Sequence, residues 1–364
     1  MLVAALLVAA GPSRGETVAV PIARLSLWGG WDSNALYEGR GGDRAGRLSP
    51  ELGVRLMNER LDLKLSGGAD LLVYERYDRG GTWNPRAALS LDGRGDRRLT
   101  VGLTGNFQHA FDPAGLAQLG VFRTGRASAT TVEGRGRLAW RATERLEVAG
   151  TYADRTVRFD DGSGGAMHAP GLEALYRVLP RVAVGAAGGV ALFQGFAATG
   201  DEHAFSSSGR ARLRVDLDRR LRLEAAAGPA LWSGPDGRAV VPEGTAELRA
   251  GYRTWDLAAT LFHGLGIGST ARPGLVTSAE VAAEKRFGLW LALRGRAGVW
   301  RSGRAPGGED AVEGYAASAE AAAYAGGGVR VLLSATRFAR IDDPSPALGR
   351  TTVGLGLSWE LEPR

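Results

Sequence analysis

The residues from Gly209 to Ser233 alternate between apolar and polar side chains in two successive segments joined by a short turn. Ala211, Leu213, Val215 and Leu217 alternate with Arg210, Arg212, Arg214 and Asp216, and Leu221, Leu223 and Ala225 alternate with Arg222, Glu224 and Ala226. A period of two residues indicates a β-strand. Each segment runs about a dozen residues, longer than the ~5–6 of a typical strand and close to the ~9–11 tilted residues that cross a bilayer.

The same unit recurs from one end of the chain to the other. We expect strands at 22–32, 47–57, 60–75, 84–93, 98–111, 127–141, 145–158, 170–178, 181–196, 205–217, 221–233, 241–252, 255–265, 275–284, 288–301, 313–325, 329–340 and 350–361. Short turns alternate with longer loops rich in Gly, Pro and Asp, as at the periplasmic and extracellular ends of outer-membrane barrels. The sequence therefore predicts an all-β protein: one transmembrane antiparallel up-and-down β-barrel of about 18 strands, with both termini in the periplasm.

Composition agrees with this fold. The 364 residues contain no apolar run long enough for a transmembrane helix, and the mean hydropathy of −0.11 fits strands with one polar face. The absence of cysteine suits passage through an oxidising periplasm. The net charge of +6 comes almost entirely from arginines spread over alternate positions, so no nucleic-acid-binding patch is expected.

The chain divides into two parts. Residues 1–15 hold an apolar run, Leu2 to Ala10, followed by small residues, which predicts a truncated secretory signal peptide; a short disordered tail is the alternative. Residues 16–364 form the barrel. The expected location is the outer membrane of a Gram-negative bacterium, with outer-membrane lipid and the barrel-assembly machinery as partners.

Aromatic side chains fall on the apolar face near strand ends. Because amphipathic rings favour the headgroup level, we expect a membrane girdle made of Trp31, Phe111, Trp140, Tyr152, Tyr252, Trp255, Tyr315 and Trp359. The alternative is that these rings pack the core of a soluble protein.

The inner wall is expected to be rich in arginine around an aqueous channel, because about 18 strands enclose more space than side chains fill. The predicted lumen basic residues are Arg135, Arg137, Arg210, Arg212, Arg214, Arg222, Arg294 and Arg296. They either guide an anionic solute or form cross-strand ion pairs that stiffen the wall.

Aromatic rings also occur on the predicted inner face. They are Trp28, Tyr74, Phe193, Trp232, Phe262, Trp290, Trp300, Tyr324 and Phe338. Flat rings stack on sugar faces, so this set suggests a saccharide pathway; the alternative is packing against a plug or an inward-folded loop. The small residues at alternate positions of 183–191 either admit another backbone closely or widen the bore, and loop 112–126 is a candidate constriction.

The sequence offers little for catalysis. His109 and His263 have lipid-facing parity, His168 and His203 lie in or beside loops, and none has the spacing of a catalytic triad. Metal ligation is not expected, and the pairs Asp160-Asp161 and Asp342-Asp343 are either solvated acids or a divalent-cation site. We expect no cofactor and no enzymatic activity.

The first strand ends in Gly30-Trp31-Asp32-Ser33-Asn34, which resembles the start of the exopolysaccharide-secretion porins of myxobacteria. The last strand, 352–361, resembles the C-terminal assembly signal of outer-membrane barrels. The first resemblance implies a conduit for polysaccharide export, with a glycan as solute and a separate periplasmic polysaccharide-export protein as partner.

The predicted function is therefore an outer-membrane pore that exports a polysaccharide. Two alternatives stay open: a general diffusion porin for small hydrophilic solutes, and a non-conducting barrel that acts in envelope assembly. A glycan conduit should carry a current that sugars block, a diffusion porin should conduct without regard to the inner aromatic rings, and a scaffold should not conduct.

Overall fold

The computed structural model describes residues 16–35, 41–77, 81–110, 128–196, 202–235, 237–268, 273–304, 309–342 and 349–361. In these residues the strands are β1(Val18–Asp32), β2(Asp43–Met57), β3(Leu61–Tyr74), β4(Thr82–Arg94), β5(Leu99–Ala110), β6(Ala129–Arg141), β7(Leu146–Phe159), β8(Gly164–Leu179), β9(Val182–Phe196), β10(Glu202–Asp216), β11(Leu221–Gly234), β12(Gly237–Gly251), β13(Trp255–Ile267), β14(Pro273–Phe287), β15(Leu291–Arg304), β16(Glu309–Gly326), β17(Val329–Arg340) and β18(Gly349–Leu361). The predicted signal peptide, Phe111 and loop 112–126 lie outside the described residues.

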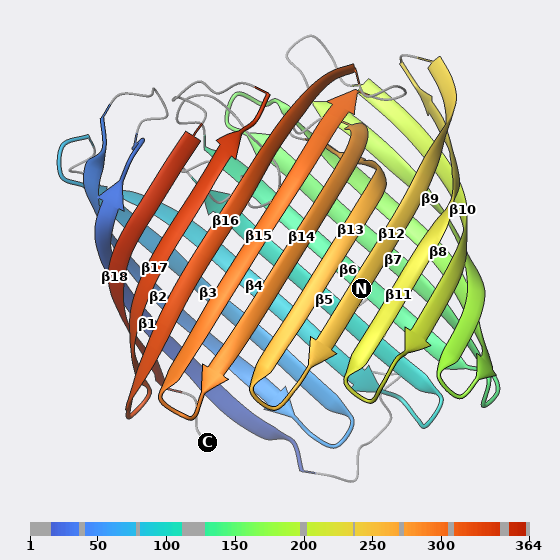
Figure 1. The fold of residues 1–364 in the computed structure, drawn as a ribbon, viewed down its shortest axis with the longest axis horizontal. Coiled ribbons are helices and arrows are strands. Elements are labelled where there is room, and N and C mark those ends of the chain that lie inside the picture. The colour runs from blue at the N-terminus through green and yellow to red at the C-terminus, as the bar shows by residue number, and fades with distance from the viewer. Residues whose placement is uncertain are drawn as a thin grey trace.

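The strands form one closed antiparallel sheet. Each strand pairs with its neighbours in the chain, and β1 also pairs with β18, from Ala23 opposite Leu361 to Asp32 opposite Thr352. Figure 1 shows the tilted strands around the barrel, with short turns at the lower end and longer connections at the upper end. The predicted all-β barrel is confirmed. Within the described residues no helix is long and apolar enough to cross a membrane.

Some strand boundaries differ from the prediction. β1 begins at Val18 rather than at 22, and β8 begins at Gly164 rather than at 170, so part of the predicted loop 159–169 is strand. β15 begins at Leu291 rather than at 288. Gly288 adopts a φ of 64°, a left-handed conformation that a strand does not contain, and the apolar pattern alone gives no sign of it. Trp290 consequently lies in a turn.

Several short turns share one local structure. A side-chain oxygen at the first position accepts hydrogen bonds from backbone N–H groups two and three residues later, as Asn and Asp do in such turns. The donor to acceptor distances are 2.9 and 2.8 Å at Asn58, 2.6 and 2.7 Å at Asp96, 3.2 and 3.0 Å at Thr143, and 2.5 and 2.8 Å at Asp218. Each turn is thus closed by its own side chain.

The aspartate turns should be sensitive to acid. Backbone N–H groups of Arg98 and Leu99 lower the pKa of Asp96, and the N–H of Arg220 lowers the pKa of Asp218. A lowered folded-state pKa means that the stabilisation is present above the ordinary carboxyl pKa and is lost as the pH falls through the folded value.

We therefore expect the amides of Leu99 and Leu221 to lose protection from hydrogen exchange as the pH falls below about 4, after correction for intrinsic rates. The equivalent amides of Leu61 and Leu146 are internal controls, because Asn58 and Thr143 do not titrate. Asp96→Asn and Asp218→Asn should remove the effect. Equal loss of protection in all of these turns would contradict this explanation.

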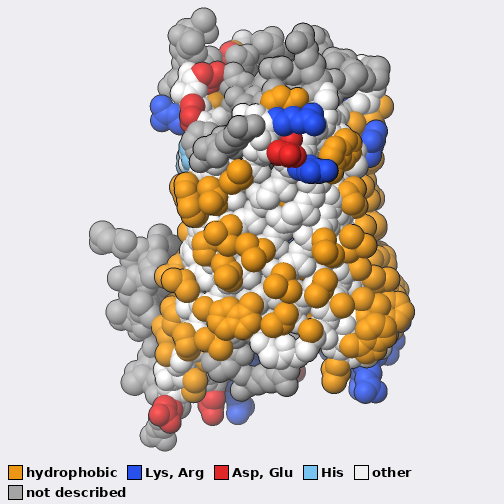
Figure 2. Space-filling model, turned by 90° about the vertical axis from the view of Figure 1, so that its left-hand side faces the viewer, with side chains coloured by type: hydrophobic (Ala, Val, Ile, Leu, Met, Phe, Trp, Pro, Cys, Tyr) orange, Lys and Arg blue, Asp and Glu red, His pale blue; other side chains and the backbone are white. Residues whose placement is uncertain are grey.

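The outer surface of the barrel is apolar across its middle. Leu52, Leu172 and Val240 are each more than 60% exposed, and Figure 2 shows hydrophobic side chains in a broad band with charged groups at both ends. Every described strand pairs with two neighbours, so the sheet closes around the barrel, as a bilayer requires of a spanning sheet. Such a surface is stable when it faces lipid, so the chain is built as an outer-membrane barrel, in agreement with the predicted location.

The predicted girdle residues that the structure describes lie on this outer surface, at different heights. Trp31 is exposed near the long-loop end, whereas Trp140, Trp255 and Trp359 are exposed near the short turns. Tyr252 stacks on Trp255, with ring centroids 4.5 Å apart. Tyr152 is exposed in the middle of β7, and the hydroxyl of Tyr315 accepts a hydrogen bond from Arg337 Nε at 2.7 Å.

A buried polar cluster joins the first and last strands at the long-loop end. Asp32 on β1 and Arg350 on β18 form an ion pair, with side chains 0% and 5% exposed, and Arg350 Nε donates to Asp32 Oδ1 at 2.9 Å. The hydroxyl of Tyr74 on β3 donates to Asp32 Oδ2 at 2.9 Å and accepts from Arg350 Nη2 at 3.0 Å. We call these three residues the seam cluster.

Ser33 and Asn34, which follow Asp32 in the Trp-Asp-Ser-Asn motif, also form hydrogen bonds between the end of β1 and the start of β18. Thr351 donates its N–H to Ser33 Oγ at 2.8 Å, and Ser33 donates its N–H to the Thr351 carbonyl at 2.9 Å. Asn34 Nδ2 donates to the Gly349 carbonyl at 2.8 Å. The residues that carry the myxobacterial resemblance therefore close the barrel here, and their geometry gives no support to a role in polysaccharide export.

Candidate functional site

The lumen contains connected cavities. Cavities of about 860, 410 and 960 Å³ follow one another inside the barrel. Trp300 borders the first and second, and Trp28, Arg47 and Asp70 border the second and third. These shared walls make the cavities parts of one lumen.

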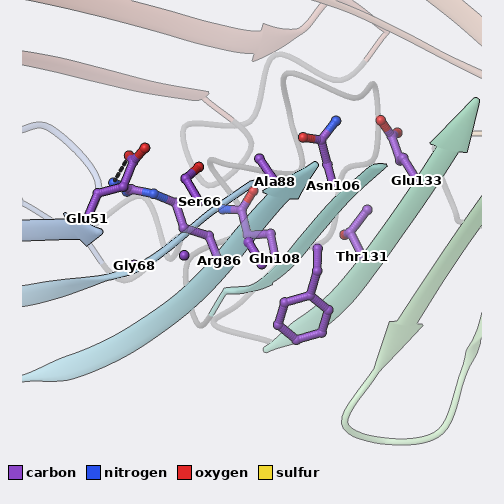
Figure 3. Close-up of a pocket in the computed structure, with 12 residues that line it drawn as sticks. Glu51, Ser66, Gly68, Arg86, Ala88, Asn106, Gln108, Thr131 and Glu133 are labelled. Atoms are coloured by element: carbon purple, nitrogen blue, oxygen red, sulfur yellow. Dashed lines mark hydrogen bonds and ion pairs between the residues drawn. The ribbon is translucent and has the colours of Figure 1, made fainter. Parts of the chain in front are cut away.

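A smaller recess of about 290 Å³ lies in the wall formed by β2 to β6. Figure 3 shows Glu51, Arg86, Asn106 and Glu133 projecting around it, with Glu51 and Arg86 linked at 3.2 Å. Glu133 also borders the 860 Å³ cavity, so the recess opens from the same lumen.

The predicted lumen arginines are mostly held in ion pairs. Arg137 pairs with Glu147 and Glu173, Arg210 with Glu243, Arg212 with Glu173 and Glu224, Arg214 with Glu224, Arg222 with Asp216, Arg294 with Glu284 and Glu320, and Arg296 with Glu280. Arg135 borders the 860 Å³ cavity, and its guanidinium makes no hydrogen bond or ion pair with the described part of the chain. Of the two readings of these arginines, the geometry favours cross-strand pairing.

Glu173 on β8 is the centre of the most extended pairing. Its carboxylate accepts a hydrogen bond from Arg137 Nη2 on β6 at 2.7 Å and pairs with Arg212 on β10. One side chain therefore links two strands that each lie two positions away from its own strand, β8. Glu224 on β11 continues the series through Arg212 at 3.3 Å and Arg214 at 2.9 Å. The wall is therefore dense in charge but locally compensated, which weakens its selection between ions.

The predicted inner aromatic residues separate into groups. Trp28, Phe262 and Trp300 border cavities and are half-buried. Phe193 and Trp232 are buried in an apolar cluster, whereas Tyr74 and Phe338, although 2% and 8% exposed, also border the 410 Å³ cavity. Arg330 covers the Tyr324 ring at 5.6 Å, near the short turns. Trp290 lies in the turn before β15 and is 63% exposed, which differs from its predicted place on an inner strand face.

The end of β13 leaves the wall and enters the lumen. β13 pairs with β12 only as far as His263, opposite Gly244, but stays paired with β14 to Ile267. Leu265 and Ile267 are 5% and 4% exposed and belong to one apolar cluster with Phe193 and Trp232. We call Leu265 to Ile267, together with Pro273 on β14, the inward hairpin end.

Small residues allow this bend. The sequence Gly264-Leu-Gly-Ile-Gly268 has no side chain at alternate positions, and a Cβ at Gly264 would lie 2.6 Å from Glu243 Cγ. On the facing wall, a Cβ at Gly195 of β9 would meet Pro273 Cδ at 3.6 Å. Ala191, in the small-residue stripe of β9, packs against the same cluster. Both predicted uses occur: Ala191 lies against another segment, and Ala187 and Gly189 border the 860 Å³ cavity.

Sequence reasoning missed both the inward hairpin end and the seam cluster. The alternating glycines at 264–268 were a usable signal for the inward hairpin end. The seam cluster was missed because Tyr74 was assigned to sugar stacking, whereas its hydroxyl bonds to Asp32. Among the described residues, no group of three or more His, Asp or Glu is placed to hold a metal ion. Asp342 accepts from Arg340 Nε at 3.2 Å, and Asp343 is not described.

No protein-family description matches the chain, and neither does any curated protein sequence. Solved structures with a similar fold are outer-membrane proteins. The outer membrane protein opdK from Pseudomonas aeruginosa has 12% identity and a TM-score of 0.42 over 94% of this chain and 99% of its own. A BenF-like porin from Pseudomonas fluorescens Pf-5 has 12% identity and a TM-score of 0.45 over 96% and 99%. Acinetobacter baumannii OccAB3 has 9% identity and a TM-score of 0.40 over 94% and 99%. We transfer no residue role or substrate from them.

Proposed function

We propose that the protein is an outer-membrane pore for the passive diffusion of small hydrophilic solutes. The observation that carries this proposal is the lumen wall, where arginines and carboxylates are paired across strands around connected cavities. Such a wall is wet and polar but has little net field along it. It suits solutes that are selected mainly by size.

Polysaccharide export, the first reading of the sequence, has less support. A glycan track needs several accessible ring faces in succession, and four of the nine predicted rings are buried. Trp28, Phe262 and Trp300, together with the largely buried Tyr74 and Phe338, border cavities and are the observation in favour of sugar contact. Nothing in the fold supports a periplasmic export partner.

The orientation is part of the proposal. Short turns face the periplasm in barrels of this type, and the first and last strands begin and end near the short-turn end. We therefore place both termini in the periplasm and the long loops outside the cell.

The test is single-channel recording from purified protein in a planar bilayer, with polyethylene glycols of increasing size and with maltodextrins. We expect a stable current, a sharp size limit, and no sugar block that depends on Trp28 or Trp300. Trp28→Ala with Trp300→Ala should leave the effect of maltodextrin unchanged. Trp359→Ala on the outer face is the matched control for tryptophan removal.

The outcomes separate the readings. A maltodextrin block that the double variant abolishes would favour a glycan conduit. No current from protein that runs as a folded barrel in unheated gels would favour the scaffold reading.

A further inference from the structure

Two cross-strand rows of the same composition lie on the outer face of the barrel at the long-loop end. On β5 to β7, His109 is opposite Thr130 and Thr130 is opposite Arg158. On β13 to β15, His263 is opposite Thr277 and Thr277 is opposite Arg301. We call these the two His-Thr-Arg rows; β8 to β12 lie between them.

The two rows have the same local geometry. His109 Nδ1 lies 2.9 Å from Thr130 Oγ1, and His263 Nδ1 lies 2.8 Å from Thr277 Oγ1. Residues directly opposite in antiparallel strands hold their Cβ atoms about 4.5–5.5 Å apart, so each arginine begins beside its threonine.

Flanking residues show that the rows point outward. Gln108, Thr131, Phe262 and Ser278 border the lumen recess or cavities, and so do Trp300 and Ser302 on either side of Arg301. Val157 and Phe159, on either side of Arg158, belong to the inner apolar cluster. Because side chains alternate between faces, the members of both rows face away from the lumen.

The outer face is apolar across its middle, but other polar side chains also lie on it: Arg337 beside Tyr315, and His168 paired with Asp154, which shares a face of β7 with Arg158. A charged side chain facing lipid costs about 2–4 kcal/mol at the bilayer centre and about 0–1 kcal/mol near the interface.

His109 and Arg158 are each one residue before the last residue of β5 and β7, and His263 and Arg301 are four and three residues before the last residues of β13 and β15, all at the long-loop end. Figure 2 shows charged groups above the hydrophobic band at that end. The rows therefore lie toward the level where headgroups meet the barrel.

We propose that the two His-Thr-Arg rows bind anionic lipid headgroups of the leaflet at the long-loop end, whose phosphate charge is not balanced by a cation within the same headgroup. Arginine supplies a fixed cation with several donors, threonine a hydroxyl, and histidine an imidazole ring whose nitrogens hydrogen-bond phosphate oxygens when they carry a proton. In the first row, the charged neighbour of His109 is Arg158. In the second row, the charged neighbour of His263 is Arg301, which also pairs with Glu313 at 3.4 Å. The Glu313 carboxylate should make the second row the weaker one.

The test is native mass spectrometry of the protein in a neutral detergent, with diphosphoryl lipid A or phosphatidylcholine added. Each row loses its imidazole and its guanidinium in His109→Gln with Arg158→Gln, and in His263→Gln with Arg301→Gln. Loss of the arginine cation at an anionic surface should weaken retention roughly fivefold.

Lys285→Gln is the matched control, because Lys285 is a cation on the outer face at the opposite end of the barrel. It should retain lipid A like the unaltered protein. Equal retention in all variants, or equal retention of lipid A and phosphatidylcholine, would overturn the proposal. Displacement of lipid A by an equal concentration of inorganic phosphate would show an anion site without lipid specificity. If a double variant does not fold, Arg158→Gln alone provides the same comparison.

Discussion

Replacing Arg350 with alanine is expected to destabilise the barrel by about 3 to 5 kcal/mol, because the change leaves the carboxylate of Asp32 buried without its cation. Asp32 is 0% exposed and would keep only the Tyr74 hydroxyl among its strong side-chain donors in the seam cluster. The measurement is urea unfolding in lipid vesicles, followed by tryptophan fluorescence and extrapolated to zero urea.

Arg222→Ala is the control for loss of an arginine. Its ion pair with Asp216 has the same type of contact, at 2.7 Å, but the side chains are 53% and 37% exposed. An exposed pair contributes about 0 to 1 kcal/mol, so this variant should stay close to the unaltered protein. If Arg350→Ala also stays within about 1 kcal/mol, the seam cluster does not hold the barrel closed.

Replacing Leu265 and Ile267 with alanine together is expected to raise single-channel conductance. Each substitution removes about 2–5 kcal/mol of buried apolar packing, which is what holds the inward hairpin end against Phe193 and Trp232. A hairpin end without these contacts should spend more time away from the wall, so the current should be both larger and noisier.

Leu261→Ala with Val281→Ala provides the matched control in the same hairpin. Both side chains are exposed on the outer face, so their loss removes apolar area without touching the lumen. Conductance should not change in this variant. If the inner double variant folds and conducts as the unaltered protein does, the hairpin end does not limit the pore.

The strand pattern was predictable because the period of two is strict. Arginines at alternate positions, Arg212, Arg214 and Arg222, require one face of the strands to be polar, so the intervening Leu213, Val215 and Leu221 must face the lipid. The observed pairing of Arg214 opposite Glu224 follows from that register. The short turns were predictable for a similar reason, because Asn58 and Asp218 interrupt the alternation with residues that close turns.

Positions where the chain departs from the repeat were not predictable in the same way. The parity of Leu265 assigns it to the lipid face, yet the bend at Gly264 turns it into the lumen. Tyr74 has the right parity for the lumen, but its hydroxyl is hydrogen-bonded to the carboxylate of Asp32. Asp32 lies on β1, two strands before Tyr74 in the chain. Parity specifies a face of the sheet; it does not specify which distant side chain arrives there.

The carboxylate of Glu173 has a mechanical consequence. It connects β6 to β10 through Arg137 and Arg212, across the inner face of the intervening strands. Backbone hydrogen bonds resist separation of adjacent strands, but they do little to stop a thin-walled tube from flattening. A tie that spans several strands on the concave side resists a change of curvature there. We therefore expect this arc of the wall to keep its shape under lateral pressure from the bilayer, and deformation to concentrate elsewhere on the circumference.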